Sequence, residues 1–384
     1  MPDSAPDHLS LLSDLLDMAR AAGAEAADAV MLQGTSLSVA RRLGKPEQVE
    51  RSEGTDIGLR VFVGKRAAVV SSSDPRHEAL RIAAGRAVEM ARAVPEDEYA
   101  GLAEPDMLAT SVPALDLDGA GEPSESVLSA RAAAAEDAAR AVSGVTNSEG
   151  ARAGWGRTRV ALATSDGFSG GYAVSHRSVS ASVIAGEGTG MERDYSSATA
   201  VHDENLEDPA VVGRRAGKRA VRRLNPRKVG TARVPLVYEP RMARGLLSSL
   251  AGAINGASIA RGTSFLRDRM GDRLFAPGVA ILDDPLRPRG LRSRPFDGEG
   301  TATAPLALVE DGVLKHWLLD SRSARKLGLQ SNGRAARGAG GGPSPSATNL
   351  YLHAGEISPQ TMIGEIGSGL LVTELIGMGV NGIT

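Results

Sequence analysis

The six histidines are the residues of this chain best suited to metal or acid–base chemistry, and they are scattered along it. They stand at His8, His77, His176, His202, His316 and His353. A zinc centre needs three convergent ligands, and two of them commonly lie on one helix face. No two of these histidines are close enough in sequence to share a helical turn, and no HExxH or HxH pattern occurs. We therefore predict that this chain has no catalytic residue and no metal ion of its own.

Two local His–carboxylate arrangements have simpler explanations. His202 is followed by Asp203 and Glu204, but these acids precede an expected helix, whose N-terminal dipole favours negative charge. His353 and Glu356 stand three residues apart, on a passage from strand to loop where that spacing does not bring side chains together. Neither arrangement predicts a metal site.

Other catalytic patterns are also missing. The chain has no cysteine, which excludes disulfides, thiolate nucleophiles and thiolate metal ligands. A serine hydrolase would place Gly-x-Ser-x-Gly between a strand and a helix, and the glycine-rich stretches at 170–171 and 367–369 do not fit that pattern. The glycine run 338–342 is not followed by Gly-Lys-Ser/Thr, so it does not indicate a phosphate loop.

A run of basic residues is the best candidate for nucleic-acid binding. It comprises Arg214, Arg215, Lys218, Arg219, Arg222, Arg223, Arg227 and Lys228. Apolar residues recur between these charges at helical spacing, so the charges are typical of the solvated face of an amphipathic helix. The net charge of −2 and the aromatic content of 3% give no further support for nucleic acid as a partner.

Composition bounds the size and location of the protein. With 384 residues, 42% hydrophobic and 23% charged, the chain predicts two or three domains. Its N-terminus lacks the basic region of a secretory signal. The uncharged stretch 245–260 is too short and too polar to span a bilayer. We expect a cytoplasmic protein that does not enter the membrane.

Helical and alternating periodicities follow one another along the chain and predict an α+β fold of mostly antiparallel sheets with helices packed on them. The expected helices lie at about 11–18, 75–94, 124–142, 207–224, 242–254 and 358–366. The expected strands lie at about 26–32, 36–42, 57–63, 66–73, 158–165, 172–186, 191–195, 234–240, 279–285, 306–310, 313–320, 347–353 and 369–377. The last of these is expected to be buried, and the low-complexity segment 331–346 to be a mobile loop.

Two Pro-, Gly- and charge-rich connections predict the domain boundaries. The segment 225–228 separates an N-terminal α+β lobe, 1–228, from a C-terminal α+β domain, 229–384. A further boundary within the lobe is expected near 95–121. Because residues 379–384 are glycine-rich, we expect the C-terminal domain to be truncated.

Several segments together carry a resemblance that covers nearly the whole chain after the first helix. They are EGTDIGLRVFVGKRAAVVSSSD, VTNSEGA, SDGFSGGYAVSHRSVSASVIAG, MERDYSSATA, LNPRKVGTARVPLVYEPRMARGLLSSLAGAINGASIARGTSFL, RPFDGEGTAT, LVEDGVLKHWLLDSRSARKLGL and GLLVTELIGMGVNGIT. In combination they resemble the TldD/PmbA metallopeptidase family, in particular its TldE (PmbA) branch, and imply that family's two-lobed architecture.

The active branch of that family carries a His-Glu-x-x-x-His helix just after a Leu-Leu pair, and a further Cys ligand near the C-terminus. Here the corresponding positions hold Ser248, Ser249 and Ala253. Hydroxyl and methyl groups cannot replace imidazole ligands or a general base. The resemblance therefore implies a heterodimer in which a TldD-type partner carries the zinc and the catalysis, while this chain, without a cofactor, helps to form a cleft for unfolded or small peptides.

Candidate cleft residues follow from the same segments. They are Arg193, Asp194, Tyr195, Asp297, Glu299, Thr348 and Asn349, each of which could instead be a turn or strand-packing residue. Two other functions stay open. The chain could be a homodimer that binds peptides without cutting them, or a modulator directed at DNA gyrase or nucleic acid.

Overall fold

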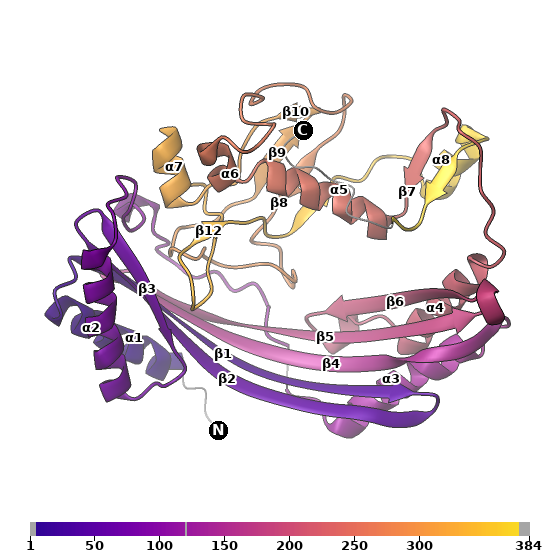
Figure 1. Ribbon diagram of the computed structural model, residues 1–384, viewed down its shortest axis with the longest axis horizontal. Coiled ribbons are helices and arrows are strands. Elements are labelled where there is room, and N and C mark those ends of the chain that lie inside the picture. Colours follow the sequence, from indigo (N-terminus) through magenta and orange to yellow (C-terminus); the bar gives the residue numbers. More distant parts are fainter. Residues whose placement is uncertain (1–4, 120, 376–384) are drawn as a thin grey trace.

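The chain folds as an α+β protein with antiparallel sheets and packed helices, which confirms the predicted fold class (Figure 1). This computed structural model describes residues 5–119 and 121–375. Residues 26–200 build a six-stranded sheet and residues 281–352 a four-stranded sheet. Figure 1 shows the C-terminal part lying over the concave side of the first sheet. Within the described ranges, no helix is long and apolar enough to cross a membrane.

The six-stranded sheet is antiparallel throughout, in the order β3-β2-β1-β4-β5-β6. Its strands are β1 (Ala26–Arg42), β2 (Lys45–Val63), β3 (Arg66–Ser72), β4 (Val145–Thr164), β5 (Ser169–Ala185) and β6 (Glu192–Ala200). The separate strands predicted at 26–32 and 36–42 are one strand, because Gly34 between them stays paired with Gly54 on one side and Thr158 on the other.

Four helices cover one face of this sheet, two at each end (Figure 1). They are α1 (Ala5–Ala21), α2 (His77–Ala93), α3 (Glu125–Arg140) and α4 (Pro209–Arg222). The predicted cap of α3 is present, because the Ser124 hydroxyl accepts a hydrogen bond from the Val127 amide at 3.4 Å. Short 3-10 turns lie at Pro105–Met107, Gly188–Gly190 and Asp203–Asn205. Apolar residues between the helices and the sheet form separate clusters, one under α1 and α2 and two under α3 and α4.

The C-terminal part is built around a four-stranded sheet in the order β10-β9-β8-β13. The strands of the C-terminal part, including those of two further two-stranded sheets, are β7 (Leu236–Tyr238), β8 (Ile281–Asp283), β9 (Leu306–Glu310), β10 (Val313–Leu314), β11 (Ala335–Ala336), β12 (Ser344–Pro345), β13 (Leu350–Leu352) and β14 (Leu370–Val372). Its helices are α5 (Pro240–Ala253), α6 (Gly256–Arg261), α7 (Ser321–Leu327) and α8 (Pro359–Ile366). The predicted hairpin turn at Asp311 and Gly312 joins β9 to β10.

The segment 331–346 is packed, so its prediction as a mobile loop was wrong. It contains the pair β11–β12, and Arg334 within it is fully buried against Asp283. Arg337 reaches back to the first sheet and forms an ion pair with Asp28. The segment also packs closely against β2 at Gly58. A side chain could not be placed there without a shift, because a Cβ would lie 2.3 Å from the Ala339 carbonyl oxygen.

The strand predicted at 369–377 is also less buried than expected. Of residues 369–375, which the structure describes, Leu370–Val372 form the strand β14, which pairs in parallel with β7. Leu370 and Leu371 are exposed. Residues 376 and 377, and the glycine-rich end at 379–384, lie outside the described residues.

Candidate functional site

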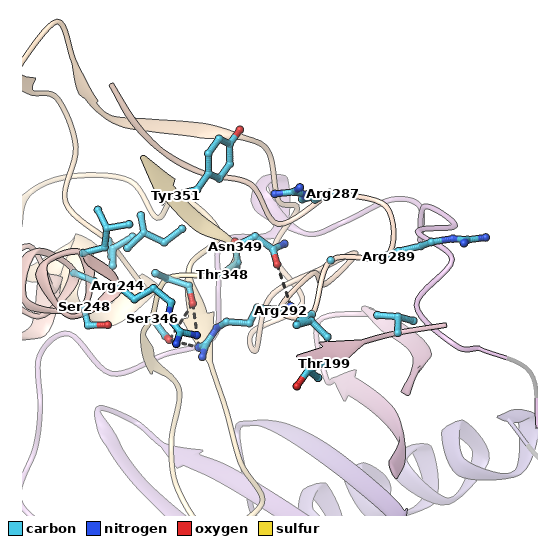
Figure 2. A pocket seen from close by; sticks show the side chains of 18 of the residues that line it. Thr199, Arg244, Ser248, Arg287, Arg289, Arg292, Ser346, Thr348, Asn349 and Tyr351 are labelled. Carbon is cyan, nitrogen blue, oxygen red and sulfur yellow. Dashed lines mark hydrogen bonds between the residues drawn. The ribbon is translucent and has the colours of Figure 1, made fainter. Parts of the chain in front are cut away.

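A cleft of about 1010 Å³ lies between the first sheet and the C-terminal part (Figure 2). One wall is the end of β6 with the turn after it, at 199–205. The others are one face of α5, the loop 287–292 and the segment 345–351 that leads into β13. Both β6 and β13 are terminal strands of their sheets.

Helix α5 presents a single face to this cleft. Arg244, Leu247, Ser248 and Ala251 line it, spaced three or four residues apart as helix neighbours are. Leu250 and Ile254 point the other way, into the apolar core of the C-terminal part. The helix begins with Pro240 at its first turn, where a missing amide hydrogen costs nothing.

The three positions that resemble a degenerate metal motif lie on this helix but do not converge. Ser248 is exposed and lines the cleft, Ser249 is exposed outside the lining, and Ala253 packs against the C-terminal core. The lining contains no histidine, aspartate or glutamate. Among residues 5–119 and 121–375, no group of three His, Cys, Asp or Glu side chains could hold a metal ion. The residues present do not fit a zinc ion.

Thr348 and Asn349, predicted as cleft residues, do line this cleft and are held rigidly there. Asp283 accepts hydrogen bonds from the Thr348 amide at 2.6 Å and from its hydroxyl at 2.9 Å. The Asn349 side chain accepts from the Arg292 amide at 3.0 Å and donates to Ser293 at 2.7 Å. This wall of the cleft is therefore preorganised.

Four arginines line the cleft: Arg244, Arg287, Arg289 and Arg292, referred to below as the arginine group. Figure 2 shows them around the opening, with Arg292 reaching toward Ser346 and Arg287 beside Tyr351. The Arg287 guanidinium carbon lies 5.8 Å from the centre of the Tyr351 ring. With no acid in the lining, the cleft is electropositive.

Arg193, Asp194 and Tyr195 lie on β6 and divide between its two faces. Arg193 and Tyr195 line a smaller hollow of about 370 Å³ on the sheet, where Arg193 pairs with Glu149 at 3.2 Å. Asp194 points the opposite way, as strand alternation requires. It is buried against Arg241 in a two-bond ion pair of 2.6 and 3.0 Å.

Asp297 and Glu299 lie in the interior rather than in the large cleft. Asp297 accepts three backbone hydrogen bonds, from Glu299, Thr301 and Ala335, and Glu299 accepts one from Ser321. Burial raises the pKa of Asp297 to about 6 and, with the nearby Asp297 charge, that of Glu299 to about 7. Asp297 also borders a separate hollow of about 270 Å³.

Three residues of the basic run, in and just after α4, form ion pairs within the chain. Arg215 pairs with Glu207, and Arg219 with Glu239 at 2.7 Å. Arg223 pairs with Glu192 at 3.4 Å and with Glu374. Nearby, His202 lies 3.1 Å from Asp116.

The arginine group was missed in the sequence because it comes from two segments more than forty residues apart. A local signal existed, since Arg287, Arg289 and Arg292 fall within six residues, in PLRPRGLRSRP. Arginines spaced in this way on an expected loop are equally typical of side chains exposed to solvent. Only the fold brings Arg244 of α5 to the same opening.

Comparison with known families gives matches along most of the chain. Three models match: PmbA/TldA metallopeptidase domain 1 over residues 27–91, the central domain over 119–224 and the C-terminal domain over 231–384. Metalloprotease PmbA of Escherichia coli O157:H7 is 35% identical over 361 residues, which are 94% of this chain and 78% of that protein. The Metalloprotease PmbA homolog of Haemophilus influenzae is 34% identical over 374 residues, 97% of this chain and 81% of that protein.

Solved structures show the same fold. The crystal structure of TldE from Thermococcus kodakarensis superposes with a TM-score of 0.84 at 22% sequence identity. The match covers 96% of this chain and 83% of that one.

Proposed function

Since this chain belongs to the PmbA/TldD metallopeptidase family, on its PmbA/TldE side, we propose that it is the non-catalytic subunit of a two-chain zinc peptidase. The observation that carries the proposal is the cleft at α5, whose lining contains no histidine, aspartate or glutamate to bind a metal. In the proposed assembly the zinc and the general base belong to a TldD-type partner.

The role of this chain is then to bind and orient the peptide. An extended peptide can add to the free edge of a sheet through its backbone, which places little demand on its sequence. The terminal strands β6 and β13 both contribute lining residues to the cleft, Thr199 and Ala200 from one and Leu350 and Tyr351 from the other. These edges suit an unfolded or small peptide.

The proposal is tested by reconstitution. The purified chain alone should bind no stoichiometric zinc by metal analysis and should not cleave an unfolded protein such as casein. Adding a zinc-loaded TldD-type subunit should produce hydrolysis that neither chain shows separately, together with a heterodimer by size-exclusion chromatography. A mixture that stays inert with zinc in excess would contradict the proposal, as would a metal ion held by this chain alone.

A further inference from the structure

The cleft has a charge that generic peptide binding does not require. The arginine group supplies four positive charges to the lining, and no lining residue is acidic. The whole chain, by contrast, carries a formal net charge of −2. The positive charge is therefore a local feature of this site.

Among residues 5–119 and 121–375, carboxylates neutralise only one arginine of the group. Arg289 pairs with Asp116 at 2.6 Å and with Glu204 at 2.7 Å, and Figure 2 shows its side chain pointing away from the other labelled residues. Arg292 donates to uncharged acceptors, the Ser346 hydroxyl at 3.5 Å and the Ala347 carbonyl at 3.3 Å. Neither Arg244 nor Arg287 forms an ion pair with a carboxylate of the described residues.

Three guanidinium groups that have no carboxylate partner in the described part of the chain face one cleft and favour an anionic ligand. A guanidinium matches a carboxylate particularly well, because its two N–H bonds can be donated in parallel to the two oxygens. The surrounding wall is held in place before any ligand arrives, since Asn255 donates to the Pro345 carbonyl at 2.7 Å and Asn349 fixes the Arg292 backbone. Preorganisation of this kind lowers the cost of binding.

A peptide fits this site better than a nucleic acid. Between the arginines the walls include apolar surface from Leu247, Leu291, Leu318 and Leu350. Strand edges are present for backbone pairing. Single-stranded nucleic acid would require stacking platforms, and the single aromatic ring of the lining, Tyr351, is already beside Arg287.

We propose that the arginine group binds a carboxylate of the peptide substrate, with Arg244, Arg287 and Arg292 as its partners, and so selects acidic segments or free C-termini. The inference rests on the proposed function, because it assigns a substrate class to the same cleft. The carboxylate can come from the C-terminus or from an Asp or Glu side chain, and the two sources can be separated experimentally.

The test measures binding of fluorescein-labelled decapeptides to the full chain by fluorescence anisotropy. One peptide carries internal glutamates and a free C-terminus, a second has glutamine in their place, and a third is amidated. The double variant Arg244→Gln, Arg287→Gln should weaken binding of the first peptide by about tenfold or more, as expected for loss of charge-assisted contacts at an exposed site. Arg86→Gln, at an exposed arginine on α2, is the matched control and should leave binding unchanged.

The outcomes separate the possibilities. Loss of binding on amidation assigns the carboxylate to the C-terminus, and loss with glutamine assigns it to side chains; both support the proposal. Equal binding of all three peptides, or no effect of the double variant once its melting temperature is shown to match wild type, would overturn it. Tighter binding of single-stranded DNA than of the acidic peptide would also overturn it.

Failure of this inference is distinguishable from failure of the proposed function. If the reconstituted pair cleaves acidic and neutral peptides equally well, carboxylate selection is wrong while the subunit role stands. If the chain alone binds acidic peptides but never supports hydrolysis with a zinc-loaded partner, the subunit role is wrong while the binding site stands.

Discussion

Glu299 and Asp297 are buried acids whose protonation is linked to folding. Their folded-state pKa values, about 7 and about 6, lie above the ordinary values of 4.5 and 3.8 because burial disfavours the charged form. At a pH between the ordinary and the folded-state pKa of each acid, the folded chain holds a proton that the unfolded chain has released. The free energy of unfolding therefore falls as pH rises through this window.

We predict that Glu299→Gln removes much of this pH dependence. Glutamine keeps the size of the side chain and an oxygen that can accept from the Ser321 amide. On going from pH 5.5 to pH 8, the free energy of unfolding of the variant should rise by about 2 kcal/mol relative to wild type. Urea denaturation at both pH values measures this difference. His176, whose pKa burial lowers, contributes in the opposite direction but equally to both proteins.

The control for this prediction is Glu310→Gln, at an exposed glutamate at the end of β9. Its free energy of unfolding should follow wild type at both pH values. A Glu299→Gln variant that also followed wild type would mean that Glu299 is ionised in the folded chain near neutral pH, against the prediction.

At the same scale, sequence alone predicted some site residues and not others. Thr348 and Asn349, predicted because they follow a glycine-rich segment that leads into a strand, line the large cleft, and their substrate role stays a prediction. Asp297 and Glu299 come from an equally polar, glycine-containing segment, yet both are 2% exposed. These two acids are buried because they accept hydrogen bonds from amides elsewhere in the chain, Glu299 from Ser321 and Asp297 from Ala335.

Among the elements, the segment 331–346 shows what local composition cannot reveal. Its glycines, arginines and prolines predict a mobile loop, whereas Arg334 and Arg337 fix it to Asp283 and Asp28, 51 and 309 residues away. Helix α3 was predicted nearly to its ends, because its cap and alanine-rich sequence are local signals. Elements held by neighbours in sequence were predictable, and those held by long-range ion pairs were not.

The packing of segment 331–346 gives a prediction for β2. Gly58→Ala places a methyl group against the Ala339 carbonyl oxygen, so the segment or the strand must shift. We expect a loss of about 1–3 kcal/mol in the free energy of unfolding. We also expect faster tryptic cleavage at Arg337, whose ion pair with Asp28 would be disturbed.

Gly54→Ala is the matched control on the same strand, since a Cβ at that position meets no atom within 4 Å. It should change the free energy of unfolding by no more than about 0.5 kcal/mol and should leave the tryptic pattern as in wild type. If the two alanine variants behaved alike, the close approach of Ala339 to β2 would not be a feature of the folded chain in solution.

On the scale of the whole molecule, two buried ion pairs join the C-terminal part to the first sheet. Arg337 reaches Asp28 on β1, and Arg241 of α5 reaches Asp194 on β6. The second contact matters more for the cleft, because α5 and the end of β6 are two of its walls. Asp194 thus positions the site without lining the large cleft.

We predict that Asp194→Asn loosens the two parts of the molecule. It leaves Arg241, whose side chain is 7% exposed, without its two-bond carboxylate partner, although Glu239 remains 3.2 Å away. Removing one partner of a buried pair should lower the free energy of unfolding by about 3 kcal/mol at pH 7. Hydrogen exchange should become faster in α5 and β6, and binding to the cleft should weaken with it.

The pH dependence of this loss identifies the ion pair as its cause. Burial raises the pKa of Asp194, but the hydrogen bonds and charge of Arg241 outweigh it and hold the pKa below 3.8. The stabilisation is therefore complete above pH 3.8 and is lost as pH falls through the folded-state value. The gap between wild type and Asp194→Asn should accordingly narrow below pH 3.8, whereas Asp268→Asn, at an 85% exposed acid, should show almost no gap at either pH. If the difference in free energy of unfolding between wild type and Asp194→Asn stayed constant below pH 3.8, the loss would come from packing of the asparagine amide and not from the charge that holds α5 beside β6.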